Sequence, residues 1–249
     1  MSDPGRGVEG GNLANADRRS GVATNGILPL EPGDRLTRAE FERRYHAMPQ
    51  VKKAELIEGV VQMSSPVRLN RHGQPHAYFV MWMAMYAGRT PGVGVADNTS
   101  DRLDLDNEPQ PDAMLFVLPE CGGQITVTDD DYVGGAAELV GEVASSRASC
   151  DLGVKCNVYR HNGVKEYIVW RVLDQAIDWF VLRDDDYVRL QPGDDGILRS
   201  EIFPGLWLDP AAIIGGDIPR LDEVLRDGLA SSEHDRFAAR LGAVAKGEH

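Results

Sequence analysis

The longest apolar stretch of the chain, Ala77 to Ala87, does most to restrict the fold. It reads Ala-Tyr-Phe-Val-Met-Trp-Met-Ala-Met-Tyr-Ala and is followed by Gly88 and Pro91, residues that commonly end helices. A membrane-spanning helix needs about 20 apolar residues, so this stretch is too short to cross a bilayer. Because it is apolar on all sides, it predicts a helix buried between other layers, with its tryptophan and methionines in the core: Trp82, Met83 and Met85.

Short β-rich segments on both sides of this helix predict a sheet. We expect a hairpin over 54–63, one or two strands over 94–105, and strands near 111–118, 138–143, 164–170, 176–182 and 187–191. Helices are expected at about 38–48, where Thr37 and Glu40 match a capping box, at 151–161, and as two surface helices beyond Pro219. This order predicts an α/β fold, a mixed β-sheet flanked by helices.

The ends of the chain differ from its middle. Residues 1–33 contain few apolar residues and no periodicity, which predicts a disordered N-terminal tail without a signal peptide and favours the cytoplasm. We expect one folded domain over 34–214 and a C-terminal helical extension over 215–249. Cys121, Cys150 and Cys156 include no C-x-x-C pair, so neither a disulfide framework nor a zinc site is indicated.

Two carboxylates stand in line with core residues of predicted strands. Asp112 shares a strand face with Met114 and Phe116, and Glu142 shares one with Val140. A carboxylate in such a position is costly unless it is paired or bound to a cation. On neighbouring strands, Asp112 and Glu142 would form a hard-oxygen site suited to magnesium.

A lysine on the next predicted helix completes the set. Leu152, Lys155 and Tyr159 have helical spacing, which predicts that they share one face and that Lys155 points toward the packed side. Near a phosphate, Lys155 could position the attacking water or offset charge in the transition state.

An ordered series of short motifs resembles the PD-(D/E)xK nuclease superfamily, and within it the Uma-two-type restriction endonuclease domain. The similarity spans roughly residues 36–214. Its pieces are Glu55-Leu56-Ile57-Glu58-Gly59, Met63-Ser64-Ser65-Pro66, His76 before a long helix, Gln110-Pro111-Asp112, Leu139-Val140-Gly141-Glu142-Val143, Ser145-Ser146, Lys155 with Tyr159, Gly163-Val164-Lys165-Glu166-Tyr167, and Phe203-Pro204-Gly205-Leu206.

The resemblance implies a restriction-endonuclease-like fold and a metal-dependent endonuclease. It implies Asp112 and Glu142 as ligands of Mg²⁺, or of Mn²⁺, with Lys155 and Glu55 as further catalytic residues. It also implies a nucleic-acid substrate, DNA rather than RNA, and a homodimer. The chain departs from the plain superfamily motif because Ala144 stands where that motif has its lysine. Glu55 is preferred over Glu58 because it matches the more distinctive position.

Simpler interpretations stay open for single residues. Asp112 could be a turn residue, and Glu142 could form a structural ion pair with Lys155 without any metal. His72 and His76 have the spacing of a helical zinc pair, but Gly73 and Pro75 predict a loop there, with His76 as a polar residue at the rim of the site.

Charge argues against a strong grip on nucleic acid. The net charge is −13, and the segment from Val95 to Glu138 contains eleven acidic residues but only one basic residue, Arg102. A nuclease that binds duplex DNA usually shows a basic stripe. Two alternatives to the nuclease therefore remain: a catalytically inactive nuclease fold that serves as a dimeric interaction module, and a hydrolase of a smaller phosphodiester.

Overall fold

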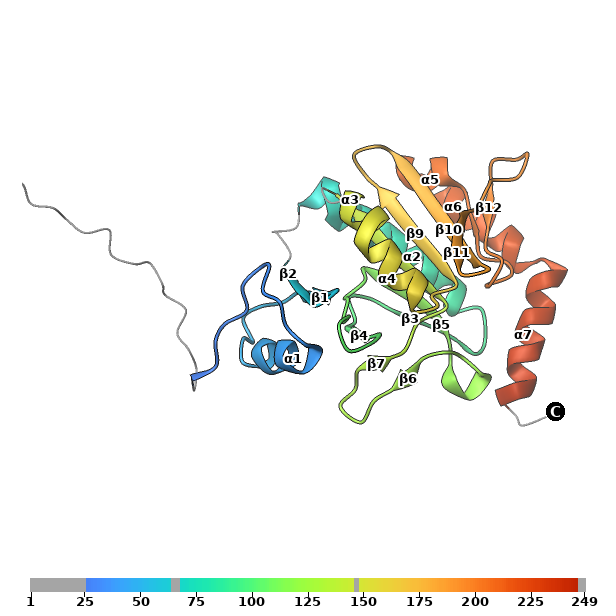
Figure 1. Ribbon diagram of the computed structural model, residues 1–249. Coiled ribbons are helices and arrows are strands. Elements are labelled where there is room, and N and C mark those ends of the chain that lie inside the picture. The colour runs from blue at the N-terminus through green and yellow to red at the C-terminus, as the bar shows by residue number, and fades with distance from the viewer. Residues whose placement is uncertain (1–25, 64–67, 146–147, 246–249) are drawn as a thin grey trace, which may run out of the picture.

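A six-stranded mixed sheet forms the centre of the molecule, with helices on both faces (Figure 1). The computed structural model describes residues 26–63, 68–145 and 148–245. The strands of this sheet are β3 (Val93–Ala96), β5 (Ala113–Val117), β8 (Leu139–Ala144), β9 (Glu166–Arg171), β10 (Ala176–Arg183) and β11 (Asp186–Arg189). Their order is β11-β10-β9-β8-β5-β3. Strands β8 and β9 are parallel, and the other neighbours are antiparallel. The predicted α/β class with a mixed sheet is confirmed.

Smaller elements surround the sheet. The helices are α1 (Arg38–His46), α2 (Gln74–Ala87), α3 (Ala148–Cys150), α4 (Cys156–His161), α5 (Pro210–Gly215), α6 (Ile218–Leu229) and α7 (Ser232–Ala245). Two π-helical turns, η2 (Leu69–Gly73) and η4 (Asp151–Lys155), and a 3₁₀ turn, η3 (Pro119–Cys121), add to these. The remaining strands are β1 (Ala54–Ile57), β2 (Val60–Met63), β4 (Asp101–Arg102), β6 (Thr126–Val127), β7 (Val133–Gly134), β12 (Leu198–Arg199) and β13 (Trp207–Leu208).

The apolar core lies on both faces of the central sheet, as alternation along the strands requires. One face packs against α2, α5, α6 and α7, with Trp82 and Met83 fully buried there. The other face packs against α4 through Tyr159, Met114 and Val140. The expected core positions of Trp82 and Met83 are confirmed, and the helix ends before Gly88 as predicted. Met85 is only half-buried and Ala77 and Ala84 are exposed, so α2 is not buried on all sides. Among the described residues, no helix is long and apolar enough to cross a membrane.

The N-terminal part of the described chain forms a unit at one end of the molecule (Figure 1). Strands β1 and β2 pair as the expected hairpin, and its turn is at Glu58 and Gly59, both with positive φ. Phe41 of α1 and Leu56 of β1 are buried together with Leu30. The chain therefore contributes to a core before residue 34, where the folded domain was expected to begin. Residues 1–25 lie outside the described part.

The predicted capping box of α1 is wrong. The Thr37 side chain makes no capping hydrogen bond. The Glu40 carboxylate is held by Arg43 and Arg44 at 2.7 and 2.6 Å, so it does not turn back to the helix start. The helix also ends at His46, two residues before the expected end.

The expected loop between His72 and His76 is also wrong. Turn η2 leads directly into α2. Pro75 is tolerated there because it stands in the first turn of α2, where the backbone N–H groups have no partner within the helix. The two imidazole rings stack with their centroids 5.4 Å apart. Both histidines therefore lie on one side of a continuous helical segment.

A π-helical turn likewise changes the face that Lys155 occupies. In η4 the wider turn places Asp151, rather than Leu152, beside Lys155. Lys155 and Tyr159 are buried as predicted, but Leu152 is exposed. The expectation that all three share one face is therefore wrong for Leu152.

The C-terminal helices α6 and α7 exist as predicted, but they are joined to the main core. Leu221 and Leu225 of α6, and Phe237 and Leu241 of α7, are buried in the same cluster as α2. In Figure 1, α7 lies at the end of the molecule away from α1.

Glu166 on β9 anchors the segment that follows β12. Its carboxylate accepts hydrogen bonds from the Ser200 hydroxyl at 2.7 Å, from the Glu201 N–H at 2.7 Å and from the Ile202 N–H at 3.2 Å. Burial raises the pKa of Glu166 to about 7, although these donors oppose the rise.

The raised pKa predicts a pH-dependent stability. The folded chain holds the proton on Glu166 up to about pH 7, whereas the unfolded chain releases it near pH 4.5. The contribution of the Glu166 proton to the free energy of unfolding is therefore complete below about pH 4.5. It is lost as pH rises to about 7, at no more than about 1.4 kcal/mol per pH unit. Burial raises the pKa of Glu108 to about 8 as well, which acts in the same direction.

Urea unfolding between pH 5 and 8 measures this effect. Glu166→Gln should reduce the slope of unfolding free energy against pH, because it removes one titrating group. Glu120→Gln is the matched exposed control, because Glu120 does not contact Glu166, and it should keep the wild-type slope. Equal slopes in all three proteins would show that the Glu166 proton does not contribute.

Candidate active site

The two predicted metal ligands lie opposite each other on adjacent strands. Strand β5 pairs with β8 in the register Ala113 with Gly141 and Met114 with Val140. One further step along this register places Asp112 opposite Glu142, and directly opposite residues of an antiparallel pair point to the same face. Both carboxylates are buried, with 3% and 4% of their residue surface exposed. The fold therefore places Asp112 and Glu142 side by side on neighbouring strands, as the sequence predicted.

Close packing behind Glu142 fixes its strand. Gly141 faces Phe79 of α2 so tightly that an added Cβ would meet the Phe79 ring at 2.2 Å. The glycine thus lets α2 lie against β8 next to the acid. No larger residue fits there without displacing the Phe79 ring.

Asp112 is held through both of its carboxylate oxygens. Oδ2 accepts a hydrogen bond from the Val143 N–H at 2.9 Å. Oδ1 forms an ion pair with Lys53 Nζ at 2.9 Å and lies 3.6 Å from His72 Nε2. Burial alone would raise the pKa of Asp112, but Lys53, His72 and the Val143 N–H outweigh burial and lower it. Asp112 is therefore an anion in the folded protein.

Glu142 shares Lys155 with Glu55. Lys155 Nζ lies 2.9 Å from Glu142 Oε1 and 2.8 Å from Glu55 Oε1. The Tyr159 hydroxyl donates a second hydrogen bond to Glu142 Oε1 at 3.0 Å. Within the described part of the chain, both of these hydrogen bonds end on Oε1, and none ends on Glu142 Oε2. The ion pair that sequence reasoning left open for Glu142 and Lys155 is thus present.

Glu55 and Glu58 play different parts, as the sequence suggested. Glu55 is buried on β1 and also accepts the Gln110 N–H at 2.8 Å. Glu58 is exposed in the hairpin turn. Glu55 therefore belongs to the cluster, and Glu58 does not.

Sequence reasoning missed three residues that lie beside these acids: Lys53, His72 and Asp151. Asp151 lies 4.0 Å from Lys155 Nζ and is 8% exposed. Lys53 precedes β1 by one residue, and His72 lies in η2. Two signals were available: the spacing of His72 and His76, for which Gly73 and Pro75 favoured a loop, and the i,i+4 spacing of Asp151 and Lys155 on the predicted helix.

His72 presents a ring nitrogen to Asp112. Its Nδ1 lies 3.0 Å from the Val143 carbonyl oxygen, which can only accept, so Nδ1 carries the hydrogen. In the neutral ring, Nε2 then carries a lone pair on the side of Asp112. His76 differs, because its Nε2 donates to the Asp112 carbonyl oxygen at 3.0 Å and lies 2.9 Å from Asp97 Oδ1.

The cluster carries more negative than positive charge. We use the term carboxylate cluster for Glu55, Asp112, Glu142 and Asp151, with Lys53 and Lys155 as their counter-ions. Four carboxylates thus face two ammonium groups. Burial raises the pKa of Glu142 to about 8 even though Lys155 lowers it, and neighbouring acids add to the rise. Burial and the same neighbours raise the pKa of Asp151 to about 6.

A divalent cation fits this cluster by charge and by donor type. Carboxylate oxygens and an imidazole nitrogen are ligands for Mg²⁺, Mn²⁺ and related ions, and a divalent ion would balance the formal excess of two negative charges. A ready-made cage is absent from the described part of the chain, since no three His, Cys, Asp or Glu side chains there converge on one point. The lysines take up carboxylate oxygens that a cation would share.

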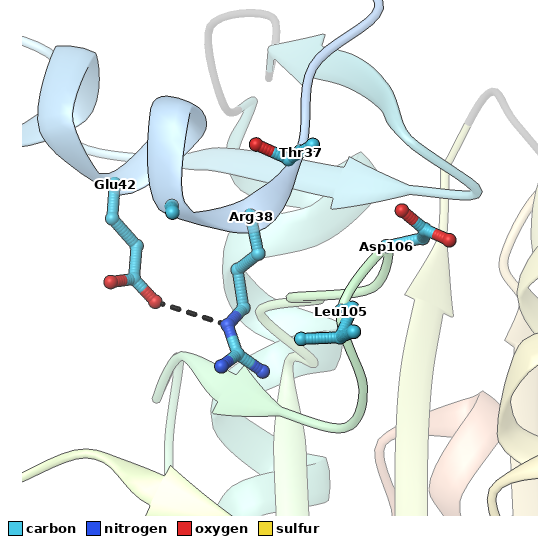
Figure 2. Close-up of a pocket in the computed structure, with 6 residues that line it drawn as sticks. Thr37, Arg38, Glu42, Leu105 and Asp106 are labelled. Atoms are coloured by element: carbon cyan, nitrogen blue, oxygen red, sulfur yellow. Dashed lines mark ion pairs between the residues drawn. The ribbon is translucent and has the colours of Figure 1, made fainter.

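A separate pocket lies at α1, and Figure 2 shows its lining. Its volume is about 340 Å³, and it lies between α1 and the loop at Leu105 and Asp106. Arg38 Nε and Glu42 Oε1, both on α1, form an ion pair of 3.3 Å in its lining. None of its lining residues belongs to the carboxylate cluster.

The chain matches one protein-family model over residues 38–211, more than half of its 249 residues. That model is Uma2, described as a putative restriction endonuclease. This chain belongs to the Uma2 family. The matched range contains every member of the carboxylate cluster and both of its lysines. The Uma2 match ends inside α5, ahead of α6 and α7.

Comparison with solved structures gives a more distant likeness. One match is the crystal structure of a putative nuclease belonging to DUF820 from Anabaena variabilis. The two chains share 11% identity with a TM-score of 0.47, over 61% of this chain and 88% of that chain. No curated protein matches the chain. The family assignment therefore rests on the Uma2 model, and it supports a nuclease-like function.

Proposed function

We propose that this protein hydrolyses phosphodiester bonds of a nucleic acid, DNA rather than RNA, with Mg²⁺ or Mn²⁺ at the carboxylate cluster. The observation that carries the proposal is the pairing of Asp112 with Glu142 in a buried cluster that has two more carboxylates than ammonium groups. Membership of the Uma2 family supports the choice of substrate class.

In this proposal Asp112, Glu142 and the His72 imidazole would hold the cation, once their side chains adjust toward a common point. When bound, the cation lowers the pKa of the attacking water and stabilises negative charge on the phosphate. The Val143 N–H fixes the orientation of Asp112, and Tyr159 with Lys155 fixes Glu142. Such fixed orientation of ligands by neighbouring hydrogen bonds strengthens a metal site.

The surroundings of Lys155 change the role that the sequence suggested. Its ammonium group is within 4.0 Å of three carboxylates, and only 6% of its side chain is exposed. We infer that Lys155 holds Glu142 and Glu55 in place and does not contact the substrate. It is therefore a positioning residue.

A cleavage assay tests the proposal. The purified full chain is incubated with end-labelled single- and double-stranded DNA and RNA, with Mg²⁺, Mn²⁺ or EDTA, at low salt because the net charge of −13 weakens association. We expect internal cuts in DNA that need a divalent cation. Cleavage of a small phosphodiester but of no polymer would instead favour the smaller substrate.

If the chain binds DNA or RNA but cleaves neither under any of these conditions, the result would favour the inactive, dimeric interaction module. Analytical ultracentrifugation of the same preparation then measures whether the chain forms the homodimer that this alternative requires.

A further inference from the structure

Two lysines reach the carboxylate cluster, and their surroundings differ. Lys155 is held by three carboxylates and is nearly inaccessible. Lys53 forms one ion pair, with Asp112, and one hydrogen bond of 3.0 Å to the amide oxygen of Asn98. Of its side chain, 21% is exposed. Lys53 is therefore the cation of the cluster that can move.

Lys53 also pairs with Oδ1 of Asp112, the oxygen that lies on the side of His72. Oδ2 is committed to the Val143 N–H. Oδ1 is the oxygen that lies 3.6 Å from His72 Nε2, a distance too long for a hydrogen bond. An ion bound between these two atoms would need Oδ1, and there it would meet the Lys53 ammonium group.

A divalent ion and the Lys53 ammonium group would repel each other at this oxygen. Two like charges about 4 Å apart in a partly buried site cost several kcal/mol before screening. Lysine has a flexible four-carbon stem, so relief requires only a rotation of the side chain toward its exposed side. The ammonium group then keeps a place beside the cluster, where the substrate would present a phosphate.

We propose that Lys53 is a displaceable counter-ion: it neutralises Asp112 while no divalent cation is bound, and it turns to a phosphate of the nucleic acid once the cation takes Oδ1. This inference rests on the proposed function. It assigns the phosphate contact to Lys53, on the hairpin side of the site, and leaves Lys155 as a positioning residue.

Direct Mn²⁺ binding, measured by electron paramagnetic resonance without substrate, tests the first half. Lys53→Met should bind Mn²⁺ about five- to tenfold more tightly than the wild type, because its competitor for Oδ1 is gone. Lys52→Met is the matched control, since Lys52 is the exposed neighbour and its loss changes the net charge equally. It should bind Mn²⁺ within about twofold of the wild type.

Salt dependence of DNA binding tests the second half. With Ca²⁺ present, the slope of log affinity against log salt should be smaller in Lys53→Met by about 0.9, the loss of one phosphate contact. Lys52→Met should keep the wild-type slope. If Lys53→Met fails to fold, Lys53→Gln takes its place, since it removes the same positive charge and keeps a polar side chain.

The outcomes separate this inference from the proposed function. If the wild type binds Mn²⁺ and Lys53→Met binds it no better than Lys52→Met does, the displacement by Lys53 is refuted while the metal site stands. If no variant binds Mn²⁺, both fail. An unchanged salt slope in Lys53→Met refutes the phosphate contact.

Discussion

Asp112→Asn and Glu142→Gln are each expected to reduce divalent-cation-dependent cleavage by about 10³-fold or more. Each variant keeps the size of the side chain but replaces a carboxyl group, which can bind the cation as an anion, by a neutral amide. A bound metal supplies several kcal/mol of transition-state stabilisation, and each 1.4 kcal/mol corresponds to about tenfold in rate. Initial rates on labelled DNA, with Mn²⁺ at saturating concentration, measure the loss.

Glu58→Gln is the control for both variants. Glu58 lies on the same hairpin as Glu55 but is exposed, so its loss should leave the rate unchanged. Both inactive variants should keep the circular dichroism spectrum of the wild type. Should Asp112→Asn or Glu142→Gln cut DNA at the rate of Glu58→Gln, the cleavage arises outside the carboxylate cluster and the proposed site is wrong.

Lys155→Met is expected to lower the free energy of unfolding by about 3–5 kcal/mol. The substitution keeps the length and apolar stem of the side chain, but it leaves Glu142 and Glu55 without their shared partner in a buried site. Removing one partner of a buried ion pair typically costs this much, because the remaining charge stays buried and uncompensated. Urea unfolding at pH 7.5 measures the change.

Lys52→Met provides the comparison, and it should lie within about 0.5 kcal/mol of the wild type because surface substitutions are usually that small. The double variant Lys155→Met with Glu142→Gln should be more stable than Lys155→Met alone, since it removes one of the two buried carboxyl groups that Lys155→Met leaves without a partner. A loss below about 1 kcal/mol in Lys155→Met would mean that the ammonium group does not stabilise the cluster.

The arrangement of the cluster explains why the chain can hold so many acids in its interior. Strands β5 and β8 place Asp112 and Glu142, the hairpin brings Glu55 and Lys53, and η4 adds Asp151 and Lys155. Lys53 precedes β1 and neutralises Asp112 next to β5, whereas Lys155 of η4 pairs with Glu142 of β8, with Glu55 of β1 and with Asp151 of η4 itself. The hairpin and η4 thus need the central sheet for charge balance as well as for packing.

The sequence by itself determined the layers and the two central acids. The alternation of apolar residues along the strands placed Asp112 in line with Met114, and Glu142 with Val140, and that periodicity holds in any regular strand. The all-apolar stretch from Ala77 to Ala87 required a buried helix for the same local reason.

Only the tertiary structure decided which cations meet these acids. Lys53 lies 59 positions from Asp112, and local spacing carries no information on that contact. In the two π-helical turns His72 lies beside Asp112, Asp151 lies beside Lys155, and Leu152 is exposed. Pairing over long distances follows from how the hairpin and η4 pack on the sheet, because burial of charge is satisfied by whichever partner the fold brings close.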